Sequence, residues 1–131
     1  MSWKLDSDRP IYTQIVERLK IQIVSGEYGP GSRLPSVRDL AMEAGVNPNT
    51  MQRAYTELER QGLVATHRSS GRQVTEETAM IKNTKNELAA EQVREFIKRM
   101  GELGFDQKEI ISLIKTGGAA INEKKEDTVN D

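Results

Sequence analysis

Residues 34–64 read LPSVRDLAMEAGVNPNTMQRAYTELERQGLV and contain two helical patterns separated by a three-residue turn. The first pattern begins at Ser36, a residue type favoured at N-caps, has Asp39 three positions later as in a capping box, and ends at Gly45. The second pattern has Asn47 at the N-cap and Pro48 at the first helical position, where proline's missing N–H costs nothing. Two helices joined by a tight turn that contains glycine predict a helix-turn-helix.

The flanking residues extend this pair into a larger domain. Apolar residues recur four apart from Ile11 to Ile23 and predict an amphipathic helix before the pair. After the pair, two β-leaning arms, residues 63–66 and 72–75, flank a Ser-Ser-Gly tip and predict a hairpin. The order helix, helix, turn, helix, hairpin predicts a winged helix-turn-helix domain over residues 9–75. The fold class is mainly α with a small β-hairpin.

The chain changes character after this domain. Residues 76–117 predict two helices, the second with Asp106 as its N-cap, and both carry apolar stripes. Two helices of this size cannot bury these stripes alone, so we predict a short two-helix dimerisation segment, with plain core packing of the stripe as the alternative. The predicted seam comprises Leu88, Val93, Phe96, Ile97, Met100, Leu103, Ile110 and Ile114. Residues 118–131 are small and charged and predict a flexible tail.

Composition restricts the class of protein. The 131 residues have a net charge of −1, but ten Lys and Arg face eight Asp and Glu before Glu76, against nine and twelve from there on. Most of the basic residues before Glu76 are arginines, which suit planar contacts with phosphate or guanine, whereas lysine dominates the remainder. No apolar run approaches the ~18 residues that cross a bilayer. We therefore expect a cytoplasmic protein with no membrane partner.

The residues that enzymes use for catalysis are sparse. The chain has no cysteine, which excludes disulfides, thiolate zinc sites and cysteine nucleophiles. It has no phosphate-binding loop, and its one histidine, His67, has no second ligand at useful spacing, which favours a surface position on the hairpin over a metal site. We predict no enzymatic activity, no cofactor and no metal.

Two motifs carry a family resemblance. Residues 31–41 read G-x-x-LPS-x-R-x-LA, and residues 49–62 read N-T-x-x-R-A-Y-x-x-L-x-x-x-G. Together they resemble the winged helix-turn-helix domain of the GntR family of bacterial transcription regulators. The short helical C-terminal part further resembles the YtrA-like subfamily, in which such a segment replaces the large effector domain of other members.

The resemblance implies a homodimer, usually a repressor, that binds a two-fold symmetric double-stranded DNA operator, often of ABC transporter genes. It places the third helix in the major groove, the hairpin tip in the adjacent minor groove and the second helix against the backbone. The implied DNA-binding residues are Ser36, Arg38, Asn47, Asn49, Thr50, Gln52, Arg53, Arg68, Ser70, Gly71 and Arg72. Phosphate contacts would set the register, while amide and guanidinium side chains at the start of the third helix would read bases.

Several of these assignments have alternatives. Asn47 and Pro48 could act as caps only, and Asn49 and Gln52 could be solvated surface residues. In relatives the hairpin reads R-x-G-x-G-T-x-V, whereas here it reads HRSSGRQV, so that Arg72 replaces a small residue and adds a cation suited to a narrow minor groove. Arg60 is better explained as a solvated charge than as a DNA ligand. The role of Arg33 is undecided, because its loop could reach phosphate.

Two alternative functions share the same fold. One is a sensor whose small-molecule effector, of unknown identity, binds at the dimer interface. The other is a DNA-binding module that serves replication or partition instead of transcription. The sequence permits both and favours neither over a transcription regulator.

Overall fold

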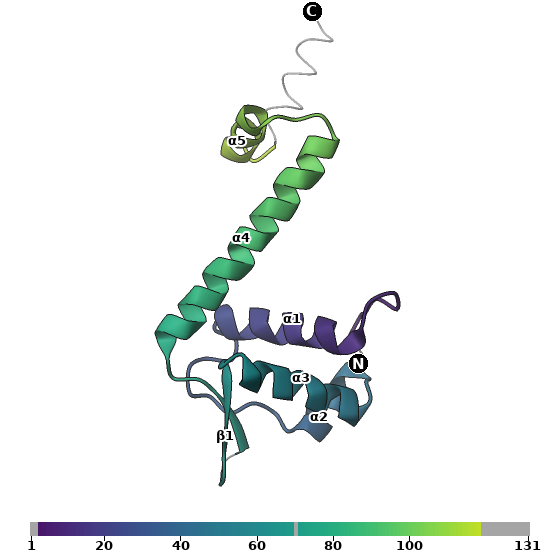
Figure 1. Cartoon of the computed structure of the whole chain (residues 1–131), viewed down its shortest axis with the longest axis vertical. Coiled ribbons are helices and arrows are strands. Elements are labelled where there is room, and N and C mark those ends of the chain that lie inside the picture. The colour runs from purple at the N-terminus through teal and green to yellow at the C-terminus, as the bar shows by residue number, and fades with distance from the viewer. Residues whose placement is uncertain (1–2, 70, 119–131) are drawn as a thin grey trace, which may run out of the picture. The chain divides into compact units, whose positions relative to one another are not determined.

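The computed structural model describes residues 3–69 and 71–118. Ser70, one of the predicted DNA contacts, and residues 119–131 of the predicted tail lie outside the described residues. Figure 1 shows a mainly helical chain with one two-stranded hairpin, which confirms the predicted fold class. The elements are α1 (Ile11–Val24), α2 (Val37–Ala44), α3 (Pro48–Arg60), β1 (Val64–His67), β2 (Gly71–Val74), α4 (Thr78–Glu102) and α5 (Gln107–Lys115).

Side-chain caps begin α2 and α3 where the sequence predicts them. The hydroxyl of Ser36 accepts a hydrogen bond from the backbone N–H of Asp39 at 3.1 Å. The side-chain oxygen of Asn47 accepts one from the N–H of Asn49 at 2.7 Å, and Pro48 occupies the first helical position. Gly45 ends α2 in the left-handed conformation, at φ +75°, a backbone geometry that other residues rarely adopt. The three-residue turn is therefore fixed by local chemistry at both of its ends.

The hairpin has a third, short partner. β1 and β2 pair antiparallel, from Val64 opposite Val74 to His67 opposite Gly71, so β1 begins and ends one residue later than predicted. The loop before α2 pairs with the other edge of β2: the N–H of Leu34 donates to the carbonyl of Arg72 at 2.9 Å. The N–H of Val74 donates in turn to Ser32 at 2.9 Å. These bonds attach the hairpin directly to the residues that lead into α2.

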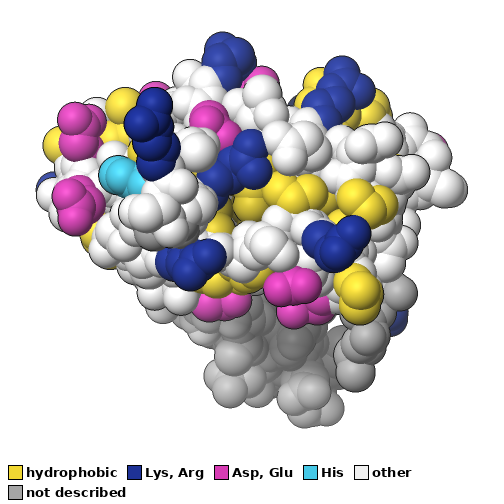
Figure 2. Space-filling model, turned by 90° about the horizontal axis from the view of Figure 1, so that it is seen from below, with side chains coloured by type: hydrophobic (Ala, Val, Ile, Leu, Met, Phe, Trp, Pro, Cys, Tyr) yellow, Lys and Arg dark blue, Asp and Glu magenta, His cyan; other side chains and the backbone are white. Residues whose placement is uncertain are grey.

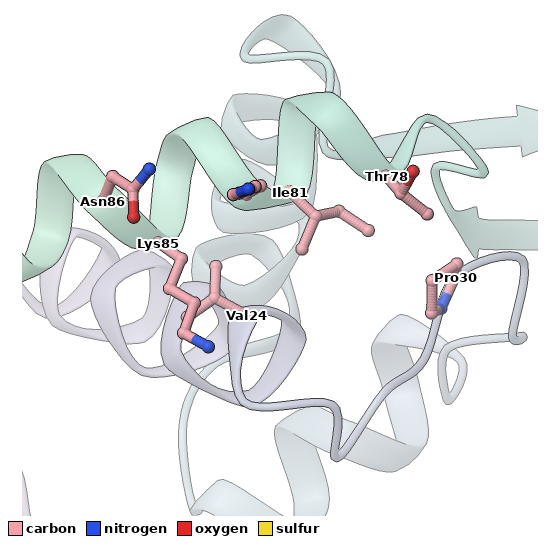
Figure 3. A pocket seen from close by; sticks show the side chains of 7 residues that line it. Val24, Pro30, Thr78, Ile81, Lys85 and Asn86 are labelled. Carbon is pink, nitrogen blue, oxygen red and sulfur yellow. The ribbon is translucent and has the colours of Figure 1, made fainter.

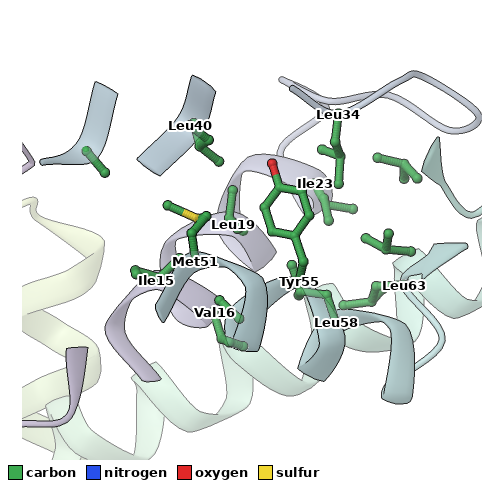
Figure 4. Packing of buried hydrophobic residues seen from close by; sticks show 14 of the residues in the cluster. Ile15, Val16, Leu19, Ile23, Leu34, Leu40, Met51, Tyr55, Leu58 and Leu63 are labelled. Atoms are coloured by element: carbon green, nitrogen blue, oxygen red, sulfur yellow. The ribbon is translucent and has the colours of Figure 1, made fainter. Parts of the chain in front are cut away.

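A single apolar core holds α1, α2, α3 and the hairpin together. Figure 4 shows the ring of Tyr55 packed among aliphatic side chains from these elements. Leu19 of α1 and Met51 and Leu58 of α3 have no exposed surface. Burial of each such side chain stabilises the fold by about 1.5–3 kcal/mol. The Tyr55 hydroxyl donates to the carbonyl of Pro35 at 2.7 Å, which joins α3 to the start of α2.

The chain divides into two compact units, the first ending at Glu87 and the second beginning at Leu88. Met80 and Ile81, in the first turns of α4, pack against the core of the first unit, which therefore extends beyond residue 75, the end of the predicted winged helix-turn-helix domain. In the second unit, α5 begins with the predicted cap at Asp106.

Candidate nucleic-acid interface

One side of α3 is polar and open, and the other side is built into the core. The buried side consists of Met51, Ala54, Tyr55 and Leu58. The open side carries Asn47, Asn49, Gln52 and Arg53, all exposed, and Thr50, half-buried. In a helix-turn-helix, residues at the N-terminal end of the second helix of the motif contact base edges. The packing of the core therefore turns the predicted contact residues outward together.

The amide side chains of Asn47 and Gln52 differ in which of their hydrogen-bonding groups already have a partner. The side-chain oxygen of Asn47 is occupied by its cap to α3, whereas its NH₂ group has no hydrogen-bond partner within residues 3–69 and 71–118. Among the described residues, the side chain of Gln52 makes only a long contact, 3.5 Å, between its NH₂ group and the Thr56 hydroxyl. Asn47 thus acts as a cap and still keeps donors for a second contact, so its two predicted roles are compatible.

Arg53 is held by a residue that the sequence did not single out as functional. Its guanidinium carbon lies 3.7 Å from the centroid of the Tyr12 ring on α1, in a cation–π contact. This pair borders a shallow hollow of about 420 Å³ lined by Pro10, Ile11, Tyr12, Asn49, Thr50 and Arg53. Only the three-dimensional packing of α1 on α3 reveals Tyr12, because the two residues are far apart in the chain.

Helix α2 presents two further predicted contacts. Ser36 is exposed; its oxygen caps α2, and its hydroxyl hydrogen remains available as a donor. Arg38 is also exposed, and no carboxylate of the described residues forms an ion pair with it. Both groups can donate to phosphate without giving up an interaction that holds the fold.

On the hairpin, Arg72 is not available in the way that Ser36 and Arg38 are, because it already forms an ion pair. Its Nε lies 2.6 Å from a carboxylate oxygen of Glu59 on α3, and its side chain is 21% exposed. The other carboxylate oxygen of Glu59 accepts from the Thr66 hydroxyl at 2.8 Å, and the Arg72 guanidinium lies 5.3 Å from the centroid of the Tyr55 ring. Arg72 therefore links the hairpin to α3, whereas Arg68 is exposed.

This link changes the ionisation of Glu59. Partial burial alone would raise the pKa of its carboxyl group, but the hydrogen bonds from Arg72 and Thr66 and the charge of Arg72 outweigh burial and leave the pKa below its usual value. The carboxylate is therefore charged at neutral pH, and the Arg72 guanidinium is bound to it.

The charges on this side of the molecule are mixed. Figure 2 shows Lys and Arg side chains spread around a band of hydrophobic side chains, with acidic side chains among them. With a net charge of −1 over the chain, no broad positive field covers the protein. Binding to DNA would depend on individually placed contacts such as those of α2 and α3.

A second hollow lies away from these residues. It has a volume of about 330 Å³ and lies between the end of α1 and the first turns of α4 (Figure 3). Its lining residues are Val24, Pro30, Thr78, Ile81, Lys82, Lys85 and Asn86. None of them belongs to the predicted DNA-binding set.

Residues 3–69 and 71–118 contain neither a candidate metal site nor a membrane-spanning helix. No group of three or more His, Cys, Asp or Glu among residues 3–69 and 71–118 is placed to hold a metal ion. Over the same ranges, no helix is both long and apolar enough to cross a membrane.

Comparison with known proteins agrees with this architecture. Residues 11–74 match the family described as "Bacterial regulatory proteins, gntR family". The chain is 40% identical to the uncharacterized HTH-type transcriptional regulator YhcF of Bacillus subtilis over 88% of this chain and 96% of that protein. It is 35% identical to the HTH-type transcriptional repressor YtrA of the same organism over 91% of this chain and 92% of that protein. Both alignments extend through α4, so the similarity is not confined to the DNA-binding domain.

A solved structure of a GntR family protein is similar in sequence and in fold. A GntR family transcriptional regulator from Listeria monocytogenes superimposes with a TM-score of 0.79 at 40% identity, covering 86% of this chain and 98% of that one. Members of the family bind DNA operators and are regulators without enzymatic activity, which confirms the prediction that this protein is not an enzyme. The chain belongs to the GntR family of DNA-binding transcription regulators.

Proposed function

We propose that the protein is a homodimeric repressor that binds a two-fold symmetric operator and acts in the cytoplasm. The observation that carries this proposal is the exposed polar face at the start of α3, opposite a fully buried apolar side. Such a face carries amide and guanidinium groups of the kind that bind base edges, and these side chains are not part of the buried core.

We assign base contacts to Asn47, Asn49, Gln52 and Arg53. Asn and Gln side chains can bind adenine through two hydrogen bonds, and Arg can bind guanine in the same way. Phosphate contacts from Ser36, Arg38 and Thr50 would set the register of the protein on the duplex. On the hairpin, Arg68 and Gly71 remain the described candidates from the predicted set.

We assign dimerisation to the second unit, because its apolar side chains are open in the single chain. None of α4 is buried, and Val93, Ile97 and Leu103 are 54%, 40% and 73% exposed. On α5, Ile111 and Ile114 are 45% and 62% exposed. A second copy of the same stripe would cover these groups in an isologous interface.

The predicted seam needs one change in this proposal. Ile110 is only 3% exposed in the single chain, so it offers no surface to a partner, and Ile111 takes its place. The half-buried Leu88, Phe96 and Met100 would extend the seam along α4.

Repression would follow from occlusion of RNA polymerase at the operator. The relative YtrA is a repressor, which supports this sign of regulation. We propose an operon with ABC transporter genes as the target. The partition and effector-sensor alternatives would use the same DNA-binding face. The position of the operator in the genome distinguishes a partition module from a transcription regulator.

Selection of bound sequences from random duplex DNA, matched to the source genome, tests the proposal. We expect a palindromic motif with half-sites about one helical turn, or about 10 base pairs, apart, upstream of an operon. Selection with Gln52→Ala should return a motif relaxed at one position in each half-site, whereas Arg60→Gln, an exposed arginine paired with Glu57, should return the wild-type motif. Recovery of no motif would refute sequence-specific binding.

A further inference from the structure

The loop before α2 brings a second arginine to the hairpin. Arg33 forms a β-bridge with Gln73, so the loop lies along the free edge of β2. The side chain of Arg33 extends toward the tip: a Cβ placed on Gly71 would lie 3.9 Å from the Arg33 Nε. Gly71 pairs with His67, the residue before Arg68, so both arginines lie at the tip end of the hairpin.

Arg33 and Arg72 differ in whether a carboxylate neutralises them. Arg72 is held at 2.6 Å by the Glu59 carboxylate and is partly buried. Arg33 is exposed, and within residues 3–69 and 71–118 no carboxylate lies within ion-pair distance of it. Moving Arg72 to DNA would break its bonds with Glu59 and leave a carboxylate close to the phosphates. Arg33 can reach DNA with no such loss.

We propose that Arg33 makes the hairpin's cationic contact with DNA, together with Arg68, and that Arg72 is a positioning residue that ties the hairpin to α3. The assignment rests on the proposed DNA-binding function and specifies which side chains of the hairpin serve it. A guanidinium beside a narrow hairpin tip matches the enhanced negative potential of a narrow minor groove.

The local structure explains how Arg33 comes to lie there. The carbonyl of Arg72 accepts from Leu34, and the carbonyl of Ser32 accepts from Val74, so backbone bonds hold Arg33 from both sides. Leu34 itself is buried in the core and prevents the loop from sliding along β2. The side chain is thus presented by fixed backbone, which reduces the entropy lost when it binds.

Binding of the selected operator and of a random duplex, measured over a range of salt concentrations, tests the assignment. Arg33→Gln should weaken operator binding ~5–10-fold and lower the salt slope by about one per subunit, with an unchanged melting temperature. Arg33→Lys should keep the slope, because it keeps the charge. Arg60→Gln removes the same charge at the far end of α3 and should change neither quantity.

Arg72→Gln provides the contrast. We expect a lower melting temperature for this variant, because Glu59 loses its partner, and a weaker affinity that follows from the disturbed hairpin. Wild-type affinity and slope for a folded Arg33→Gln protein would overturn the assignment while leaving the proposed function intact. Failure of the wild-type protein to bind either duplex would overturn the proposed function and this assignment with it.

Discussion

Arg53 on α3 lies with its guanidinium carbon 3.7 Å from the centroid of the Tyr12 ring on α1. The ring restricts an otherwise long and mobile side chain, so that Arg53 is already oriented before DNA arrives. Ordering a free arginine on binding costs about 0.5–1.5 kcal/mol, and a contact made in advance reduces this cost. If Arg53 contacts DNA as proposed, we expect the first helix to contribute to recognition through Tyr12, a residue outside the helix-turn-helix motif.

Replacement of Tyr12 tests this contribution. Tyr12→Leu should weaken operator binding about two- to fivefold, the equivalent of about 0.5–1 kcal/mol for an exposed cation–π contact, and Tyr12→Phe should bind as the wild type does. Fluorescence anisotropy with a labelled operator measures both. Adding Arg53→Gln to each background completes a double-mutant cycle, in which the cost of Arg53→Gln should be smaller when Tyr12 is leucine. Equal costs in both backgrounds would show that the ring does not act through Arg53, and a loss with Tyr12→Phe would point to the hydroxyl instead.

The exposed apolar stripe of α4 leads to a prediction about the oligomeric state. Ile97→Glu places a charge in the proposed seam and should convert a dimer to a monomer, measured by light scattering after size-exclusion chromatography. Lys98→Gln changes the net charge by the same single unit at a neighbouring exposed position and should remain a dimer. Operator affinity should fall only in the first variant. A dimeric Ile97→Glu protein would place the interface elsewhere.

The Glu59–Arg72 link predicts a pH dependence of stability. Because the pKa of Glu59 is lowered in the folded protein, its contribution is fully present above the unfolded value, about 4.3, and is lost as the pH falls through the lower folded value. Glu59→Gln should reduce the free energy of unfolding by about 1 kcal/mol at neutral pH, since the charge-assisted bonds are partly open to solvent. Urea unfolding of the wild type and of Glu59→Gln measures the difference between their free energies of unfolding. This difference should be constant from pH 7 to about 5 and should become smaller at lower pH.

Other carboxyl groups are common to both proteins and cancel in that difference. Glu57 in particular is held by hydrogen bonds from Arg60 and Gln61, which lower its pKa to about 2. A difference that grew as the pH fell would contradict the assigned direction of the Glu59 shift.

The local features of the fold could be predicted from the sequence, and the interactions between distant residues could not. Caps at Ser36, Asn47 and Asp106 depend on residues two or three positions apart, and all three form as predicted. The pairing of Arg33 with Gln73 joins residues that are far apart in the chain. The loop contributes only one isolated bridge to the hairpin. A single paired residue leaves no alternation of apolar and polar residues in the sequence from which the pairing could be predicted.

The same limit applies to the candidate site. Periodicity placed Asn49 and Gln52 off the buried stripe of α3, and both are exposed as expected. It could not show that Arg72, which looks like a free cation in the hairpin sequence, is neutralised by Glu59 from another element. Ion pairs between elements follow from tertiary packing, so charge alone does not identify a DNA contact.

Asn47 allows its structural and its DNA-binding roles to be separated. Asn47→Ala removes the cap and should lower the free energy of unfolding by about 1 kcal/mol. Asn47→Ser keeps an oxygen that can accept from the N–H of Asn49 but lacks the NH₂ donors, so its stability should match the wild type. If the NH₂ group reads a base, Asn47→Ser should nevertheless lose about 1–3 kcal/mol of operator affinity and relax the preference at one position of each half-site. Urea unfolding and repeated selection on random DNA measure the two effects independently. Wild-type affinity and preference in Asn47→Ser would reduce Asn47 to a cap and leave base reading to Asn49, Gln52 and Arg53.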